Sequence, residues 1–198
     1  MLKFKLVNHT FLRLTLIYPS FLFKQKKLFM EIRAFEREKD LQNVLKLNQR
    51  LVELLSPMTA HQFDNINEDN SHVLVAEEDG QFAGFFMLVK SNADYESENF
   101  RWFQKRYDNF IYVDRVAVAN EFRGRGIGSE FYQRAFDYAE KNNIDYMFAE
   151  IHMDPPNEKS LAFHDSLGFV EEGTAVLKGD HHYSLQKKVF NPAVEKSA

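Results

Sequence analysis

A glycine-rich turn between an apolar run and a helical pattern constrains this sequence more than any other feature. The run Val116-Ala117-Val118-Ala119 passes through a short polar link into Arg123-Gly124-Arg125-Gly126-Ile127-Gly128, and the helical pattern of 129–141 follows. Glycine tolerates unusual backbone angles and lets a ligand come close to the main chain. The first N–H groups of a helix lack partners within the helix, and the helix dipole adds positive potential there. The stretch therefore predicts an anion site, above all for a phosphate or pyrophosphate.

The spacing of these glycines excludes two common phosphate-binding loops. No Lys-Ser or Lys-Thr pair follows them, so the stretch is not a P-loop. The third glycine of the Gly-x-Gly-x-x-Gly dinucleotide fingerprint is replaced by Ser129, and the motif lies in the middle of the chain. What remains is Arg-x-x-Gly-x-Gly after the end of a strand. A simple glycine turn before a surface helix is the alternative that the loop alone leaves open.

Composition narrows the function classes further. The chain has 198 residues, 44% of them hydrophobic, which suits one soluble domain with a sizeable core. Its net charge of −4 gives no reason to expect a nucleic acid or another strongly anionic partner. The absence of cysteine excludes disulfides and a cysteine-bound acyl intermediate, and it fits a reducing cytoplasm.

Residues 1–29 differ from the rest, because they are rich in Phe, Leu, Lys and Arg and contain no acid. Their apolar run is too short and too interrupted for a membrane-spanning helix, which needs about 20 apolar residues. A signal peptide or a basic surface anchor are alternatives. We expect a dispensable or mis-assigned extension at 1–29, a domain at 30–190 that begins at Met30, and a tail at 191–198.

The order of patterns along the chain predicts one α/β domain with a mixed central sheet of six to seven strands and flanking helices. Asp40 is predicted to cap the first helix, Asp79-Gly80 to form a hairpin turn, and Gly84 to mark a bulge or a close approach. The expected strands are 30–35, 72–77, 81–90, 112–119, 145–152, 170–178 and 182–189, with Gly179-Asp180 as the last turn. The expected helices are 40–55, 59–67, 100–107, 129–141 and 157–167.

A second motif lies one helix and one strand after the glycine loop. The segment Asn157-Glu-Lys-Ser160-Leu-Ala-Phe-His164-Asp-Ser-Leu-Gly-Phe169 is similar to the signature Asn-x-x-Ala-x-x-Leu-Tyr-Glu-x-Leu-Gly-Phe. Together the two motifs resemble the GNAT superfamily of N-acetyltransferases, over about residues 30–189. Shorter features look like a bacterial and archaeal subgroup of predicted acetyltransferases without a firm substrate; they are Ser56-Pro57, Ala93-Asp94-Tyr95, Arg101-Trp102-Phe103, Tyr112-Val113-Asp114-Arg115 and Asp154-Pro155-Pro156-Asn157.

The resemblance implies the GNAT fold and acetyl-CoA as acyl donor, lying between two splayed strands, here 112–119 and 145–152. The backbone of Val116 and Val118 would pair with the pantetheine amides, and an N–H near Val118 would stabilise the oxyanion. Ala117, which lies between them, is also expected among the cofactor-binding residues. The N–H groups of Gly124, Arg125, Gly126, Ile127 and Gly128 would bind the pyrophosphate, with charge from Arg123 or Arg125. Asn157 and Ser160 would contact the pantetheine or phosphate region.

Three residues are predicted to serve catalysis. Asp114 interrupts an apolar strand and is the first choice for general base or amine anchor, with an ion pair to Arg115 as the alternative. Glu150 on the next strand is the second choice, with a structural hydrogen bond as the alternative. His164 stands where members of the superfamily often have a tyrosine that acts as the general acid. It could donate a proton if its surroundings raised its pKa; packing or capping is the alternative.

These observations predict an N-acetyltransferase that passes the acetyl group directly to an amine of a small molecule or a protein, in a ternary complex. A non-catalytic domain that binds acetyl-CoA as a sensor or scaffold is the alternative, because His164 replaces tyrosine. A nucleotide-binding module is a third class, which the second motif disfavours. We expect no metal, since His181-His182 lacks acidic or thiol partners at ligand spacing. No nucleic acid or membrane is expected, and a homodimer is possible in this superfamily.

Overall fold

A computed structural model describes residues 29–66, 70–177 and 180–193. Except for Phe29, the expected extension at 1–29 lies outside this part of the chain. Gly179 of the last expected turn and residues 194–198 of the expected tail lie outside it too. Within the described ranges, none of the helices is long and apolar enough to cross a membrane.

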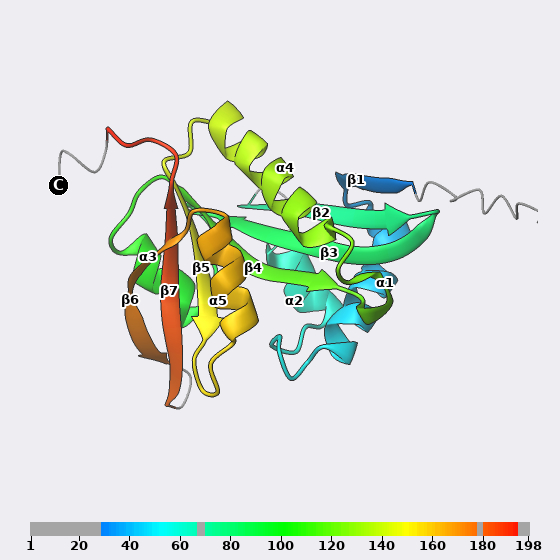
Figure 1. The fold of residues 1–198 in the computed structure, drawn as a ribbon, viewed down its shortest axis with the longest axis horizontal. Coiled ribbons are helices and arrows are strands. Elements are labelled where there is room, and N and C mark those ends of the chain that lie inside the picture. Colours follow the sequence, from blue (N-terminus) through cyan, green and yellow to red (C-terminus); the bar gives the residue numbers. More distant parts are fainter. Residues whose placement is uncertain (1–28, 67–69, 178–179, 194–198) are drawn as a thin grey trace, which may run out of the picture.

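The described strands form one sheet in the order β1-β2-β3-β4-β5-β7-β6, in which only β4 and β5 are parallel neighbours (Figure 1). The strands are β1 Met30–Ala34, β2 Ser71–Glu78, β3 Gln81–Lys90, β4 Phe110–Val118, β5 Tyr146–His152, β6 Val170–Leu177 and β7 His181–Val189. The helices are α1 Arg37–Arg50, α2 Ala60–Ile66, α3 Glu98–Gln104, α4 Ile127–Lys141 and α5 Glu158–Ser166. The predicted α/β class and mixed sheet are confirmed.

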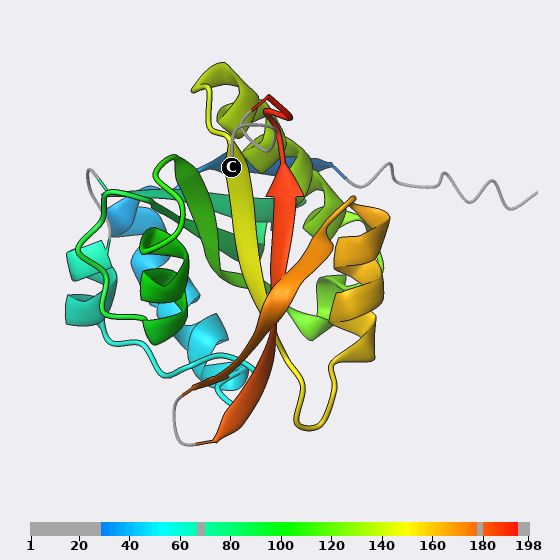
Figure 2. The same ribbon diagram turned by 90° about the vertical axis from the view of Figure 1, so that its left-hand side faces the viewer.

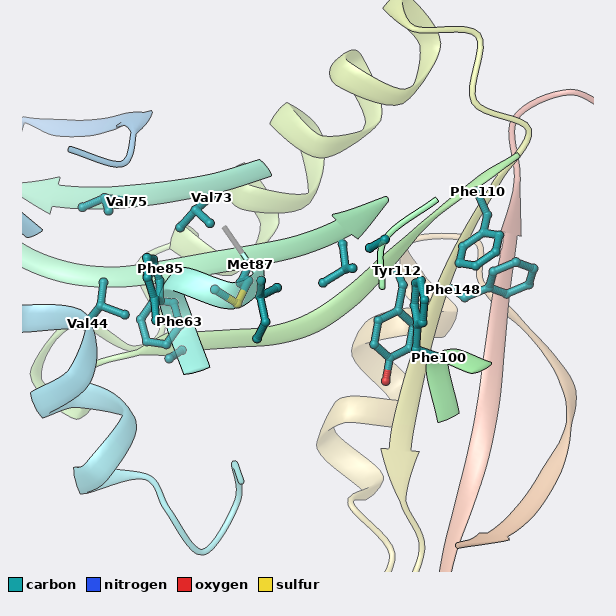
Figure 3. Close-up of a cluster of buried hydrophobic side chains, with 14 of the residues drawn as sticks. Val44, Phe63, Val73, Val75, Phe85, Met87, Phe100, Phe110, Tyr112 and Phe148 are labelled. Carbon is teal, nitrogen blue, oxygen red and sulfur yellow. The ribbon is translucent and has the colours of Figure 1, made fainter. Parts of the chain in front are cut away.

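The helices form a layer on each face of the sheet, with α1, α2 and α3 on one face and α4 and α5 on the other (Figures 1 and 2). Strand side chains alternate between two apolar cores, as a pleated sheet requires. Phe85 and Met87 of β3 pack with α1, α2 and α3, whereas Phe86 and Leu88 pack with α4. Figure 3 shows part of the first core, where Phe100, Phe110, Tyr112 and Phe148 gather beside the junction of β4 and β5.

The two parallel strands separate soon after they meet. Pairing between β4 and β5 covers only residues 110–112 and 146–148, although β4 continues to Val118 and β5 to His152. In Figure 1 the two strands run in different directions beyond their junction, while β3 and β7 stay paired to their outer edges. We call this opening the fork; it matches the strand pair that the resemblance predicted to splay.

Both ends of the first helix were predicted wrongly, because it runs from Arg37 to Arg50 and not over 40–55. Helix α1 begins at Arg37 rather than after Asp40, because Asp40 does not cap the helix. Its buried carboxylate instead accepts hydrogen bonds from both terminal nitrogens of Arg33, at 2.6 and 2.7 Å, and one from Glu36 N at 2.8 Å. These bonds fasten α1 to β1, and Arg33 and Glu36 together keep the pKa of Asp40 below its ordinary value against the opposing effect of burial.

Gly84 allows β3 to approach β4 closely. It lies opposite Val118, and a bulge that leaves Ala83 without a partner on β2 adjoins it. A Cβ at this position would collide with the carbonyl oxygen of Ala117 and lie 3.3 Å from Val118 Cα. Both parts of the sequence prediction, the bulge and the close approach, are therefore confirmed.

Gly84→Ala is expected to lower the free energy of unfolding by about 1–3 kcal/mol, as overpacking commonly does. The cause is that β4 backbone, unlike the end of a flexible side chain, cannot move away without disturbing the fork. Urea unfolding followed by circular dichroism measures the change. Gly173→Ala on β6 is the matched control, since its Cβ would meet nothing within 4 Å. Equal stability of the two variants would contradict the prediction.

Candidate active site

The inner edge of β4 presents backbone groups to the fork. Ala119 N donates to Ala83 O of β3 at 2.9 Å, and successive residues of a strand direct their N–H and C=O groups to alternate edges. The groups of Ala117 therefore face β3 as well, whereas those of Val116 and Val118 face the fork. This agrees with the predicted contacts of Val116 and Val118. Ala117, which is also among the expected cofactor-binding residues, has its carbonyl oxygen against Gly84 of β3.

The glycine loop ends at the N-terminus of α4, as predicted. Gly124 and Gly126 have φ angles of +75° and +84°, in the left-handed region that glycine adopts without strain. Gly126 is the residue before the helix, and its carbonyl accepts the first intrahelical bond from Glu130 N at 3.0 Å. The N–H groups of 127–129 precede that bond and lie at the positive end of the helix dipole. The loop therefore has the backbone geometry of an anion site.

The two arginines of the loop have different surroundings. Both terminal nitrogens of Arg125 are engaged, one with the buried carboxylate of Glu78 on β2 and the other with Glu121 O at 2.7 Å. Arg123 is exposed, and its Nε donates to Val118 O at 3.2 Å. Because Glu78 balances the charge of Arg125, Arg123 is the better placed of the two to add positive charge at the loop.

Helix α5 packs beside the start of α4. Its N-cap is Asn157, whose side chain accepts from Ser160 N at 3.2 Å. A Cβ on Gly128 would lie 3.6 Å from the ring of Phe163, so the first turn of α4 packs against α5. The predicted phosphate-binding residues and the predicted pair Asn157 and Ser160 thus lie at the N-terminal ends of two helices that pack together on one face of the sheet.

His164 lies inside the interface between α4 and α5, with 4% of its surface exposed. Its Nδ1 is 2.8 Å from Ser160 O, and a carbonyl can only accept, so Nδ1 carries the hydrogen. Nε2, 2.6 Å from the hydroxyl of Tyr132, then accepts from it. Burial lowers the pKa of His164, with the Ser160 carbonyl opposing the shift. The raised pKa on which its acid role depended is therefore absent, and the geometry matches the packing alternative.

His164→Gln is expected to weaken the dependence of folding stability on pH between about pH 7.5 and about pH 5.5. The folded-state pKa of His164 lies below its ordinary value of 6.5, so the unfolded chain binds more protons in this window. Stability is consequently present above pH 6.5 and lost as the pH falls. Urea unfolding of the wild type and the variant at both pH values measures how much the free energy of unfolding changes. Burial also lowers the pKa of His72, but His72 is present in both proteins and affects them alike. The prediction would be contradicted if both proteins lost the same unfolding free energy as the pH falls.

Tyr112 and Glu150 join the two strands at the start of the fork. The hydroxyl of Tyr112 donates to Glu150 Oε2 at 2.6 Å, and the Tyr112 side chain is buried. Burial, with the neighbouring carboxylates of Glu150 and Asp114, raises the pKa of Tyr112 well above its ordinary value, so it remains a neutral donor. Glu150 is half-buried and lies two residues beyond Phe148, the last residue of β5 that pairs with β4. It is thus a carboxylate at the base of the opening.

Asp114 lies at a bulge on the other side of the fork. Leu88 of β3 pairs with Val113 and Met87 with Arg115, so Asp114 has no partner on β3. One of its carboxylate oxygens accepts from the hydroxyl of Tyr95 and the other from Arg115 Nε at 2.5 Å. The ion pair with Arg115, which the sequence left open as the alternative, is present.

Some parts of the site were not predicted. Tyr95, Tyr132 and Glu78 contact site residues 19, 32 and 47 positions away along the chain. Tyr95 belongs to an acidic, aromatic insertion that could have suggested an acceptor-side role, but Tyr132 and Glu78 carry no such signal. Among the described residues no group of three or more His, Cys, Asp or Glu side chains could bind a metal.

Comparisons with known proteins agree with this geometry. The family model for the acetyltransferase (GNAT) family matches residues 38–169. No curated protein is significantly similar to the chain.

Solved structures are similar over most of the domain. A ribosomal-protein-alanine N-acetyltransferase from Brucella melitensis is 27% identical, with a TM-score of 0.63 over 81% of this chain and 99% of that chain. An N-acetyltransferase from Staphylococcus aureus Mu50 is 20% identical, with a TM-score of 0.63 over 82% of this chain and 99% of that one. A spermidine/spermine N-acetyltransferase from Vibrio cholerae is 19% identical, with a TM-score of 0.58 over 85% of this chain and 97% of that chain.

Proposed function

Because this chain belongs to the GNAT family of acetyltransferases, we propose that it transfers an acetyl group from acetyl-CoA directly to a primary amine of a small molecule or a protein. The observation that carries the proposal is the fork, whose inner edge on β4 ends at the glycine loop and the N-terminus of α4. One continuous path thus offers backbone groups to a pantetheine arm and N–H groups to a pyrophosphate. Direct transfer is supported by the absence of cysteine.

Each end of this path fits a different part of acetyl-CoA. The N–H groups of 127–129, with Arg123 beside them, suit the pyrophosphate. Val116 and Val118 offer amide groups to the pantetheine arm, while Asn157 and Ser160 approach from α5. When bound, acetyl-CoA supplies the acetyl thioester that is the acyl donor.

Glu150 is the residue that we assign to the acceptor amine. A lysine-like amine has a pKa near 10 and must lose a proton before it attacks the thioester. Glu150 lies at the base of the fork, where it could receive that proton directly or through a water molecule. Tyr112 orients the carboxylate by donating to Oε2 at 2.6 Å. The departing thiolate takes up a proton in the same transfer, and His164 is too deeply buried to be our choice for its donor.

The surroundings of His164 favour one competing function. A domain that binds acetyl-CoA without transferring the acetyl group could serve as a sensor or scaffold. This function would be distinguished from catalysis by tight binding of acetyl-CoA while none of the amine classes tested gives thiol release above background.

Calorimetric titration of the full chain with acetyl-CoA, CoA, ATP and NAD tests the proposal first. Binding of acetyl-CoA and CoA, with ATP and NAD binding more weakly, is expected. Thiol release is then measured with polyamines, lysine peptides and peptides with an N-terminal alanine, the last because of the ribosomal-protein-alanine enzyme reported above. A preference for ATP or NAD would refute the proposed function.

A further inference from the structure

A carboxylate on a neighbouring strand is paired with the glycine loop. Glu78 is the last residue of β2, and its side chain is only 5% exposed. Its carboxylate accepts a hydrogen bond from Nη1 of Arg125, while Nη2 of the same guanidinium donates to Glu121 O at 2.7 Å. The guanidinium carbon also lies 5.3 Å from the centre of the Phe122 ring. Arg125 thus joins β2 to the short 3-10 turn Asn120–Phe122 that leads into the loop.

The charge of Glu78 opposes the binding that the loop is proposed to perform. The pyrophosphate of acetyl-CoA is an anion, and a negative charge near its site lowers its affinity. Glu78 also engages the guanidinium of Arg125, which could otherwise bind a phosphate oxygen. A buried ion pair is weak evidence for stability, because removing two charges from water costs much of what their attraction returns. The role that fits the position of Glu78 is therefore to hold the backbone of the loop.

The two left-handed glycines of the loop are not held by packing on the side where a side chain would lie. Gly124 and Gly126 flank Arg125 and have φ angles of +75° and +84°. A Cβ built on either glycine would meet nothing within 4 Å in the described part of the chain. Glycine loses more conformational freedom on ordering than any other residue. Since Arg125 is the residue between them, its bonds to Glu78 and Glu121 restrain the backbone on both of its sides.

We propose that Glu78 and Arg125 are positioning residues, which fix the glycine loop in its anion-binding conformation before acetyl-CoA arrives. The inference rests on the proposed function, because it requires the pyrophosphate to bind at the N–H groups of 127–129. Arg125 then acts through the backbone and does not contribute its charge to the pyrophosphate. A loop that is already ordered loses less conformational freedom on binding, so the affinity is higher. This ordering outweighs the repulsion that Glu78 adds.

The direction of the change in affinity separates positioning from electrostatics. Glu78→Met keeps an unbranched side chain of similar length but removes both the negative charge and the acceptor for Arg125. Electrostatics alone would then strengthen the binding of acetyl-CoA, whereas loss of positioning weakens it. Calorimetric titration of the full chain is expected to give a dissociation constant at least about fivefold higher. An unchanged or lower dissociation constant would overturn the proposal.

A conservative variant separates the hydrogen bond from the charge. Glu78→Gln removes the same charge but keeps an acceptor for Nη1 of Arg125. It is expected to bind acetyl-CoA at least about threefold more tightly than Glu78→Met. Equal affinities of these two variants would overturn the proposal. If Glu78→Met does not fold, Glu78→Thr takes its place, because its side chain is two atoms too short to reach Arg125.

Glu77→Met is the matched control. Glu77 precedes Glu78 on β2, and its carboxylate is ion-paired with Arg33 at 2.5 Å and with Lys39 at 2.7 Å. Lys39 belongs to α1, which covers the face of the sheet opposite α4 (Figure 1). The control therefore loses an ion pair that has no printed bond to the glycine loop, and wild-type affinity is expected. A loss of affinity equal to that of Glu78→Met would indicate general destabilisation and overturn the proposal.

Hydrogen–deuterium exchange without a ligand tests the order of the loop itself. Phe122 N donates to Ala119 O at 2.9 Å and Arg123 N to Asn120 O at 3.3 Å, so these amides report loosening. Exchange within 120–126 is expected to rise at least about threefold in Glu78→Met and to stay at the wild-type level in the control. Unchanged exchange in Glu78→Met would overturn the proposal. If the wild-type chain binds no acetyl-CoA, the proposed function has failed, and exchange alone decides whether the pair orders the loop.

Discussion

Replacing Gly126 by glutamate is expected to weaken acetyl-CoA binding at least about 100-fold, which corresponds to about 2.7 kcal/mol. Gly126 has a φ of +84° and immediately precedes α4. A carboxylate there would place negative charge where the pyrophosphate is proposed to bind, beside the N–H groups of 127–129. Calorimetric titration with acetyl-CoA measures the loss directly.

Two further glycine variants distinguish charge from strain. Gly126→Ala adds a side chain in the same left-handed conformation, which costs about 1–2 kcal/mol of folding stability but introduces no charge. Gly173→Glu adds the same charge on β6, where φ is ordinary and a Cβ meets nothing within 4 Å. We expect intermediate binding for the first variant and wild-type binding for the second. Wild-type affinity in Gly126→Glu would mean that the glycine loop does not bind the pyrophosphate.

Glu150→Gln is expected to lower kcat by about 100- to 10,000-fold, the usual contribution of a general base. Glutamine preserves the shape of the side chain and can still accept the hydrogen bond of Tyr112, so the strands at the fork stay joined. It cannot take up the proton of the amine. Thiol release at saturating acetyl-CoA measures kcat, and calorimetry is expected to give an unchanged affinity for acetyl-CoA.

Tyr112→Phe is the companion variant to Glu150→Gln. It removes the bond that orients Glu150 but leaves the carboxylate itself, so a smaller loss of kcat is expected. If Glu150→Gln keeps kcat within threefold and raises only the acceptor KM, Glu150 is an amine anchor rather than the base. If neither parameter changes, the carboxylate has only the structural hydrogen bond that the sequence left open as its alternative.

The fold was predictable where the signals are local. Strand β3 was predicted with its observed bounds, because Asp79-Gly80 sets its start and a polar segment follows its end. The start of α1 was predicted wrongly because Asp40 has the residue type of a cap, whereas its partner Arg33 lies on another element. Helix α3 begins at Glu98, two residues earlier than expected, with Ser97 as its cap. A residue's capping potential is visible in a sequence, but the competing partner that overrides it is not.

The catalytic candidates show the same division. Asp114 and Glu150 were selected because a carboxylate in an apolar strand requires a reason, and His164 because it stands where the superfamily often has a tyrosine. Their environments then differed: Asp114 is paired with Arg115, Glu150 remains at the opening, and His164 is enclosed with Tyr132. These environments depend largely on partners from other elements: Tyr95 beside Asp114, Tyr112 beside Glu150 and Tyr132 beside His164.

The sequence alone determined the glycine loop and the start of the helix that follows it. A glycine loop and a helix N-terminus depend on backbone angles and on unpaired N–H groups of one contiguous segment, so residues 116–128 specify their own geometry. The surroundings of the buried charged residues were decided by tertiary structure. Arg115 and Asn48 are 67 residues apart, and Tyr95 and Asp114 are 19 apart. Whether a buried charge is paired depends on which side chains the folded sheet brings beside it, and no local pattern in the chain encodes that choice.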